Sequence, residues 1–90
     1  DLFLKETPDL IAGMQQSLTN HDVESWTRAT HSLKSSSAQL GALKLSALCK
    51  ESETIGREGH ATNLTEKLAH IEAEFEHVRE SLVFHQRYGV

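Results

Sequence analysis

The sequence predicts an all-α protein: an antiparallel four-helix bundle with a short N-terminal leader helix. Four segments repeat apolar residues at three- and four-residue spacing, which is the periodicity of amphipathic helices. One proline and five glycines in 90 residues favour helices over many turned strands. The connections between the segments are short, and short connections place successive helices antiparallel. We expect a single domain spanning residues 1–90.

The first predicted helix spans residues 2–18 and is interrupted at Pro8. Proline lacks a backbone N–H and suits the first turn of a helix, so Thr7 is the expected cap. Two arrangements remain open, a leader helix over residues 2–6 followed by a second helix, or one kinked helix. In the polar connection that follows, Asn20 and Asp22 are both candidate caps for the next helix.

The second predicted helix spans residues 22–39 and is ended by Gly41. Trp26 is its largest buried side chain. The rest of the buried stripe has helical spacing and comprises Val23, Thr30, Leu33, Ser37 and Leu40.

The third predicted helix spans residues 42–55. Leu45, Leu48, Ser52 and Ile55 share one face. Residues 56–60 are bounded by glycines and are predicted to form a loop.

The fourth predicted helix spans residues 63–83 and has the clearest pattern. Its apolar seam consists of Leu64, Leu68, Ile71, Phe75, Val78 and Leu82. The side chains expected to form its solvated face are Glu72, Glu74, Glu76, Arg79 and Glu80. Asn63 followed by Glu66 resembles a capping box, with Thr62 as the alternative cap. Residues 83–90 give no clear signal.

Composition excludes several classes of protein. A net charge of -4 without a Lys or Arg cluster argues against nucleic-acid binding. The single cysteine, Cys49, excludes an internal disulfide and is expected to be a small buried hydrophobe. No apolar run approaches the roughly 20 residues that span a bilayer, and no secretion signal is present. We therefore expect a cytoplasmic monomer without direct membrane contact.

The chain begins with Asp1 rather than Met, so we expect it to be part of a larger protein.

His31 is the main candidate for chemistry. Helical geometry places it about 130° from the centre of the buried stripe, so it projects outward. Its surface neighbours are Thr27, Lys34, Ser35 and Ala38. The small neighbours leave room beside the imidazole, and the lysine supplies a positive charge. These surroundings suit a phosphoryl group that is bound to the imidazole or transferred by way of it.

Glu53 is the expected partner of His31. In the hairpin that Gly41 creates, His31 lies ten residues before the glycine and Glu53 twelve after it, so the two should be level. We expect Glu53 to accept a hydrogen bond from His31 Nδ1–H. This bond would fix the tautomer and leave Nε2 unprotonated and nucleophilic.

The same stretch resembles the histidine phosphotransfer (HPt) domain of multistep two-component signalling. The resemblance rests on His31, Leu33, Lys34, the serines 35–37 and Leu40-Gly41-Ala42, followed by Leu45, Leu48, Cys49 and Glu53. It extends over most of the chain, including the regions of Phe3-Leu4 and Thr7-Pro8 and the break over residues 56–59. Thr30 stands where the family commonly has alanine, and Ser35 where it commonly has glycine.

The resemblance implies that His31 exchanges a phosphoryl group with aspartates of response-regulator receiver domains. It implies that the domain has no kinase activity of its own. It also implies that the parent protein is a hybrid sensor histidine kinase, a class that can be anchored in the inner membrane. Lys34 is expected to neutralise phosphoryl oxygens, and Ser35 to donate a hydrogen bond.

The surface expected to contact the receiver includes Thr27, Ala38 and Gln39. The resemblance assigns Mg²⁺ to the receiver, and we expect no cofactor or metal site in this chain.

Two other functions are compatible with a helical bundle. One is a helical interaction domain that binds partners without phosphorylation. The other is a metalloenzyme bundle, since His70, Glu74 and His77 share one helical face and Glu74-x-x-His77 matches half of a di-iron motif. That pair faces away from the apolar seam, which disfavours a metal. Hydrolase chemistry is disfavoured because the serines near His31 lie on a surface without an evident oxyanion hole.

The remaining histidines, His21, His60 and His85, are expected in loops or at the terminus.

Overall fold

The computed structural model consists of four helices: α1 (Leu2–Asn20), α2 (Val23–Leu40), α3 (Leu43–Arg57) and α4 (Leu64–Tyr88). The structure describes residues 2–59 and 63–88, without the side chains of residues 85–88. No strand occurs within these ranges, and the predicted all-helical four-helix bundle is confirmed.

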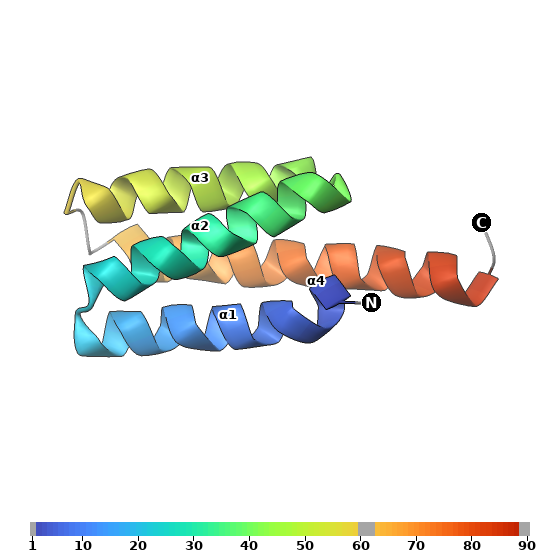
Figure 1. Cartoon of the computed structure of the whole chain (residues 1–90), viewed down its shortest axis with the longest axis horizontal. Coiled ribbons are helices and arrows are strands. Elements are labelled where there is room, and N and C mark those ends of the chain that lie inside the picture. Colours follow the sequence, from blue (N-terminus) through green and yellow to red (C-terminus); the bar gives the residue numbers. More distant parts are fainter. Residues whose placement is uncertain (1, 60–62, 89–90) are drawn as a thin grey trace.

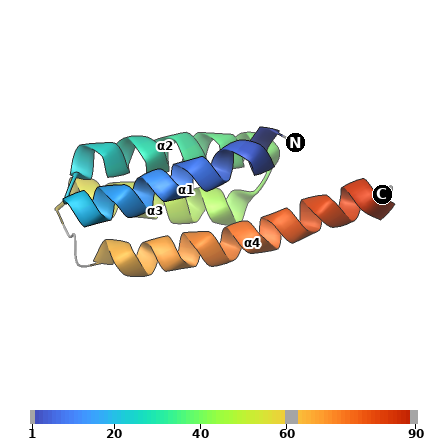
Figure 2. The same ribbon diagram turned by 90° about the horizontal axis from the view of Figure 1, so that it is seen from below.

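Successive helices run antiparallel, and each packs against two others (Figure 1). α1 contacts α2 and α4, and α3 contacts the same two helices. α4 is the longest, with 25 residues, and its C-terminal end extends beyond the other three (Figure 2). Within the described ranges, no helix combines the length and the apolar character needed to cross a membrane.

α1 is one continuous helix with Pro8 inside it, so the prediction of a separate leader helix was wrong. Thr7 does not cap a new helix, because its hydroxyl donates to the Phe3 carbonyl one turn earlier at 2.7 Å. Phe3 packs edge-to-face on Phe75 of α4, with ring centroids 5.9 Å apart. Tertiary packing of the first two turns therefore keeps the helix intact despite the missing N–H of the proline.

Both ends of α2 are capped by residues that the sequence predicted as its caps. Asp22 is the N-cap, and its Oδ1 accepts a hydrogen bond from the Ser25 N–H at 3.1 Å. Gly41 ends the helix with a left-handed φ of 90°, a conformation that glycine adopts without steric cost.

The middle of the predicted buried stripe of α2 is confirmed. Trp26, Thr30, Leu33 and Ser37 are all buried. Val23 and Leu40, predicted in the same stripe, are exposed. Each lies in a terminal turn of α2, where the neighbouring helices cover the stripe only in part.

α3 continues two residues past its predicted end, so Gly56 belongs to the helix and not to a loop. Gly56 is buried against the indole of Trp26, and a Cβ there would lie 2.7 Å from Trp26 Cδ1. The Trp26 Nε1–H donates to the Ser52 carbonyl of α3 at 3.1 Å. This glycine therefore serves close helix packing, and it does not end the helix.

α4 begins at Leu64 and continues to Tyr88, five residues beyond its predicted end. No glycine or proline occurs between Leu64 and Gly89, so nothing in the sequence stops the helix. The seam residues Leu64, Leu68, Ile71 and Phe75 are buried, while Val78 and Leu82 are partly buried. Glu72 and Glu74 are half-buried, not solvated as predicted. Gln15 of α1 donates to the Glu72 carboxylate, and Lys44 of α3 forms an ion pair with that of Glu74.

The capping box at Asn63 stays a prediction, and the alternative cap Thr62 lies outside the described residues.

Replacing Gly56 with Ala should destabilise the fold. The new methyl group would overlap the Trp26 ring, and overpacking of this kind costs about 1–3 kcal/mol. Gly13→Ala in α1 is the matched control, because a Cβ there meets nothing within 4 Å. The control should stabilise by about 0.5–1 kcal/mol, since alanine is the better helix former. Urea unfolding measures both, and equal effects would contradict the packing role of Gly56.

Replacing Ser37 with Ala should stabilise the protein by about 1 kcal/mol, because a buried hydroxyl without a partner carries a desolvation cost. Ser37 is fully buried, and its Oγ has no hydrogen-bond partner among the described residues. Ser52→Ala is the control, because the equally buried Ser52 Oγ donates to the Leu48 carbonyl at 2.7 Å. Ser52→Ala should be neutral or destabilising, and the reverse order would contradict this account.

Candidate functional site

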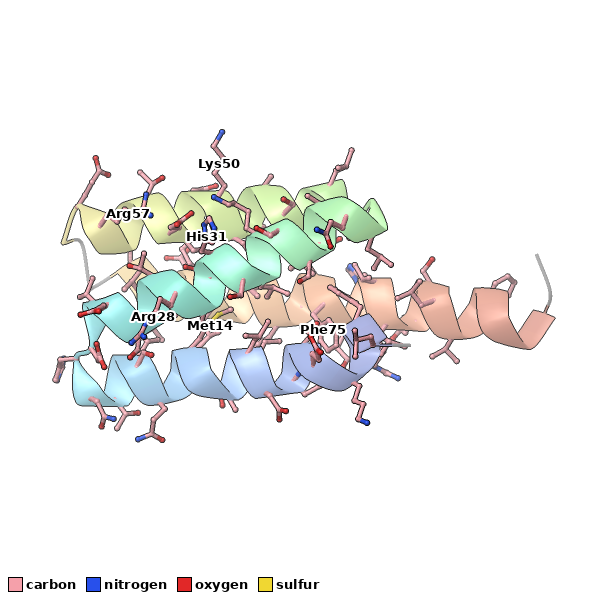
Figure 3. The ribbon with its side chains drawn as sticks, in the orientation of Figure 1. Met14, Arg28, His31, Lys50, Arg57 and Phe75 are labelled. Atoms are coloured by element: carbon pink, nitrogen blue, oxygen red, sulfur yellow. The ribbon has the colours of Figure 1, made fainter. Side chains whose placement is uncertain are left out.

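His31 lies near the middle of α2, at the junction with α3 (Figure 3). Its side chain is 58% exposed. Trp26 and Thr30, its buried neighbours in the chain, fix the orientation of the helix by packing into the core. The imidazole is therefore held at the surface by a helix that cannot rotate without exposing its apolar stripe.

Glu53 of α3 is level with His31 and is almost completely buried, with only 3% of the residue exposed. Its Oε2 lies 3.2 Å from His31 Nδ1. Its Oε1 accepts a hydrogen bond from Lys34 Nζ at 2.8 Å. Arg57 Nη2 forms an ion pair with Oε2 at 2.9 Å. Three basic side chains thus converge on one buried carboxylate.

The surroundings of Glu53 favour its charged form. Burial alone raises the pKa of the carboxyl group, because desolvation penalises the anion. The hydrogen bond and charge of Lys34, together with the charges of Arg57 and His31, outweigh that effect, and the pKa of Glu53 is lowered overall. A carboxylate can only accept hydrogen bonds, so a hydrogen bond between the two groups requires the hydrogen on His31 Nδ1. In the neutral ring, Nε2 then keeps its lone pair.

Two further hydrogen bonds join α2 to α3 and fix the register of the two helices. The Trp26 Nε1–H donates to the Ser52 carbonyl at 3.1 Å. The Ser46 hydroxyl donates to the Lys34 carbonyl at 3.0 Å. Both donors are side chains reaching across the helix interface, so the offset between His31 and Glu53 is set by specific contacts.

The other residues predicted near His31 differ in their exposure to solvent. Ser35, Ala38 and Gln39 are exposed. Thr27 is half-buried, and its hydroxyl donates to the Val23 carbonyl at 2.8 Å. The Lys34 side chain is only 27% exposed, and its ammonium group contacts Glu53. The lysine is therefore already paired within the site.

Arg57 was missed by the sequence reasoning. The glycine at position 56 predicts the end of the helix, which puts Arg57 in the following loop. In the structure the helix continues, and Arg57 lies four residues after Glu53 on the same helix, which is the spacing of an ion pair. The four-residue spacing of Glu53 and Arg57 was the feature of the sequence that could have predicted this ion pair.

Cys49 is fully buried, as predicted. Burial raises the pKa of its thiol to about 12, and the negative charge of Glu53 adds to the effect. The thiol is therefore protonated and unreactive at neutral pH.

His70 and His77 of α4 do not gather with other potential metal ligands. His77 Nδ1 lies 3.4 Å from Glu74 Oε1 on the surface, and the described part of the chain holds no group of three or more potential metal ligands. His21 is exposed in the turn after α1, while His60 and the side chain of His85 lie outside the described residues.

Comparison with known proteins gave one match. Residues 1–81 match the family model described as Hpt domain. No curated protein and no solved structure matched.

Stability should depend on the charge of Glu53. Its pKa in the folded protein lies below the ordinary value of 4.5, so the unfolded chain binds the proton more readily. The stability that the anion contributes is present above about pH 4.5 and is lost as the pH falls through the lower folded pKa. Glu53→Gln resembles the protonated form at every pH.

The free energy of unfolding of the original protein should therefore exceed that of Glu53→Gln at neutral pH. The difference should shrink in urea titrations repeated below about pH 4.5. Glu58→Gln, which removes an exposed negative charge just after α3, should not reproduce this convergence. A difference for Glu53→Gln that stays constant into acid would contradict the ionised, ion-paired state.

Proposed function

Because the chain belongs to the Hpt domain family, we propose that it is a phosphorelay module in which His31 carries the phosphoryl group. Histidine phosphotransfer in two-component signalling is the activity of the family. The observation that supports His31 as the carrier is its exposed imidazole, with Nδ1 bound to a buried carboxylate from another helix.

His21 and His77 lack this support. His21 lies in a turn with a positive φ of 56°. His77 contacts only Glu74 of its own helix, at the surface. Neither is held in one tautomer by a buried anion, which is what makes one ring nitrogen of a neutral histidine a reliable nucleophile.

The proposed reaction begins with an aspartyl phosphate on a response-regulator receiver domain. The lone pair of His31 Nε2 attacks phosphorus, the bond from phosphorus to the aspartate oxygen breaks, and its electron pair returns to the aspartate carboxylate. Nε2 carries no proton, so none has to be removed. The ring becomes an imidazolium that bears the phosphoryl group, and its Nδ1–H remains directed at the Glu53 carboxylate. The reverse steps pass the group to a second receiver.

Charge stabilisation is the main task left to the protein, since phosphoryl transfer depends on positioning and electrostatics. Lys34 has a flexible four-carbon stem, so its ammonium group can turn from Glu53 towards phosphoryl oxygens. Ser35, one turn after His31 and exposed, can donate a further hydrogen bond. The Mg²⁺ ion of the reaction belongs to the receiver, whose carboxylates suit it.

The proposed receiver contact surrounds His31 on α2 and includes Thr27, Ala38 and Gln39. Ala38 and Gln39 are exposed, and none of the three carries a charge, so the surface does not repel an acidic receiver site. We place the domain in a multistep relay within a hybrid sensor kinase, working as a monomer.

The experiment offers a panel of phosphorylated receivers to the protein. The label should appear on the original chain as an acid-labile, alkali-stable group and be absent from His31→Gln. His77→Gln, the matched control on α4, should keep it. Glu53→Ala should slow transfer roughly tenfold or more without abolishing it, as expected when a group that orients a functional imidazole is removed. Label that survives in His31→Gln at the normal rate would refute the assignment.

A further inference from the structure

Glu53 has more cationic partners than the orientation of His31 requires. One partner, Lys34, contacts Oε1 from α2, while Arg57 contacts Oε2 from α3. His31 Nδ1 shares Oε2 with Arg57. The lysine therefore holds one oxygen by itself, and the arginine and histidine hold the other.

The two cations differ in how they can respond to a phosphoryl group on Nε2. Lys34 lies one turn after His31 on α2, beside the position that the phosphoryl group would take. Arg57 lies one turn after Glu53 on α3, so it stays with the carboxylate whatever α2 binds. Arg57 also remains charged at any physiological pH.

Releasing Lys34 has a cost if nothing replaces it. A carboxylate that is 3% exposed is strongly destabilised when it loses its only counter-ion, because water cannot reach it. Such a carboxylate would hold the Lys34 ammonium group in the ion pair and prevent it from reaching the phosphoryl group. With Arg57 bound to Oε2, the negative charge stays compensated when the ammonium group turns away.

We infer that Arg57 is a positioning residue that frees Lys34 for the phosphoryl group by serving as the second counter-ion of buried Glu53. This inference rests on the proposed function of His31. It assigns a role to a side chain whose ion pair is with Glu53 and not with the imidazole. While Lys34 remains on Glu53, the 65% exposed guanidinium should contribute little.

The experiment uses the full chain and phosphoramidate, a small donor that phosphorylates imidazole with release of ammonia and needs no receiver. The rate of phosphohistidine formation is measured for Arg57→Gln in two backgrounds, the original chain and Glu53→Gln. Arg57→Lys tests rescue by another cation. Arg28→Gln is the matched control, because Arg28 lies on α2 towards α1, away from Arg57 (Figure 3).

In the original background, Arg57→Gln should slow the reaction about three- to tenfold, as expected when a charged hydrogen bond to the phosphoryl group is partly lost. Arg57→Lys should restore most of the rate, and Arg28→Gln should leave it unchanged. In the Glu53→Gln background no buried anion holds Lys34, so Arg57→Gln should have almost no effect.

Equal slowing in both backgrounds would overturn the inference, since Arg57 would then act directly on the phosphoryl group or through the end of α3. No slowing in the original background would overturn it as well. A failure of the proposed function looks different, because the original chain would then form no more phosphohistidine than His31→Gln.

Discussion

The site depends on one constraint, the burial of a carboxylate at the interface between α2 and α3. Taking a charged group out of water costs several kcal/mol unless partners compensate it. Glu53 meets this demand with Lys34, Arg57 and His31, which all reach it within 3.2 Å. A carboxylate fixed by these cations is also in position to accept a hydrogen bond from His31 Nδ1–H.

Helix packing makes this arrangement possible. Gly56 lets the indole of Trp26 lie against α3 where a side chain would collide with it, and the indole N–H binds the same helix through the Ser52 carbonyl. The close approach brings Glu53 under His31, and the uninterrupted helix carries Arg57 to within reach of the carboxylate. A glycine and a tryptophan in the core thus determine the electrostatics at the surface.

Periodicity was sufficient to predict the four helices and the outward direction of His31, because both depend on one helix at a time. Counting residues from Gly41 was sufficient to place Glu53 level with His31. The burial of Glu53, the pairing of Lys34 and the role of Gly56 depend on how closely two helices approach. A single helix does not encode that distance, so these features were missed. Pro8 was misjudged for the same reason, because contacts between Phe3 and Phe75 keep α1 continuous.

The tautomer of His31 is the central claim, and nitrogen-15 NMR of the imidazole tests it most directly. At a pH where the ring is neutral, the account predicts the hydrogen on Nδ1 and an unprotonated Nε2, with this preference lost in Glu53→Gln. A neutral ring protonated mainly on Nε2 in the original protein would contradict the account, because the nitrogen assigned to attack phosphorus would then have no free lone pair.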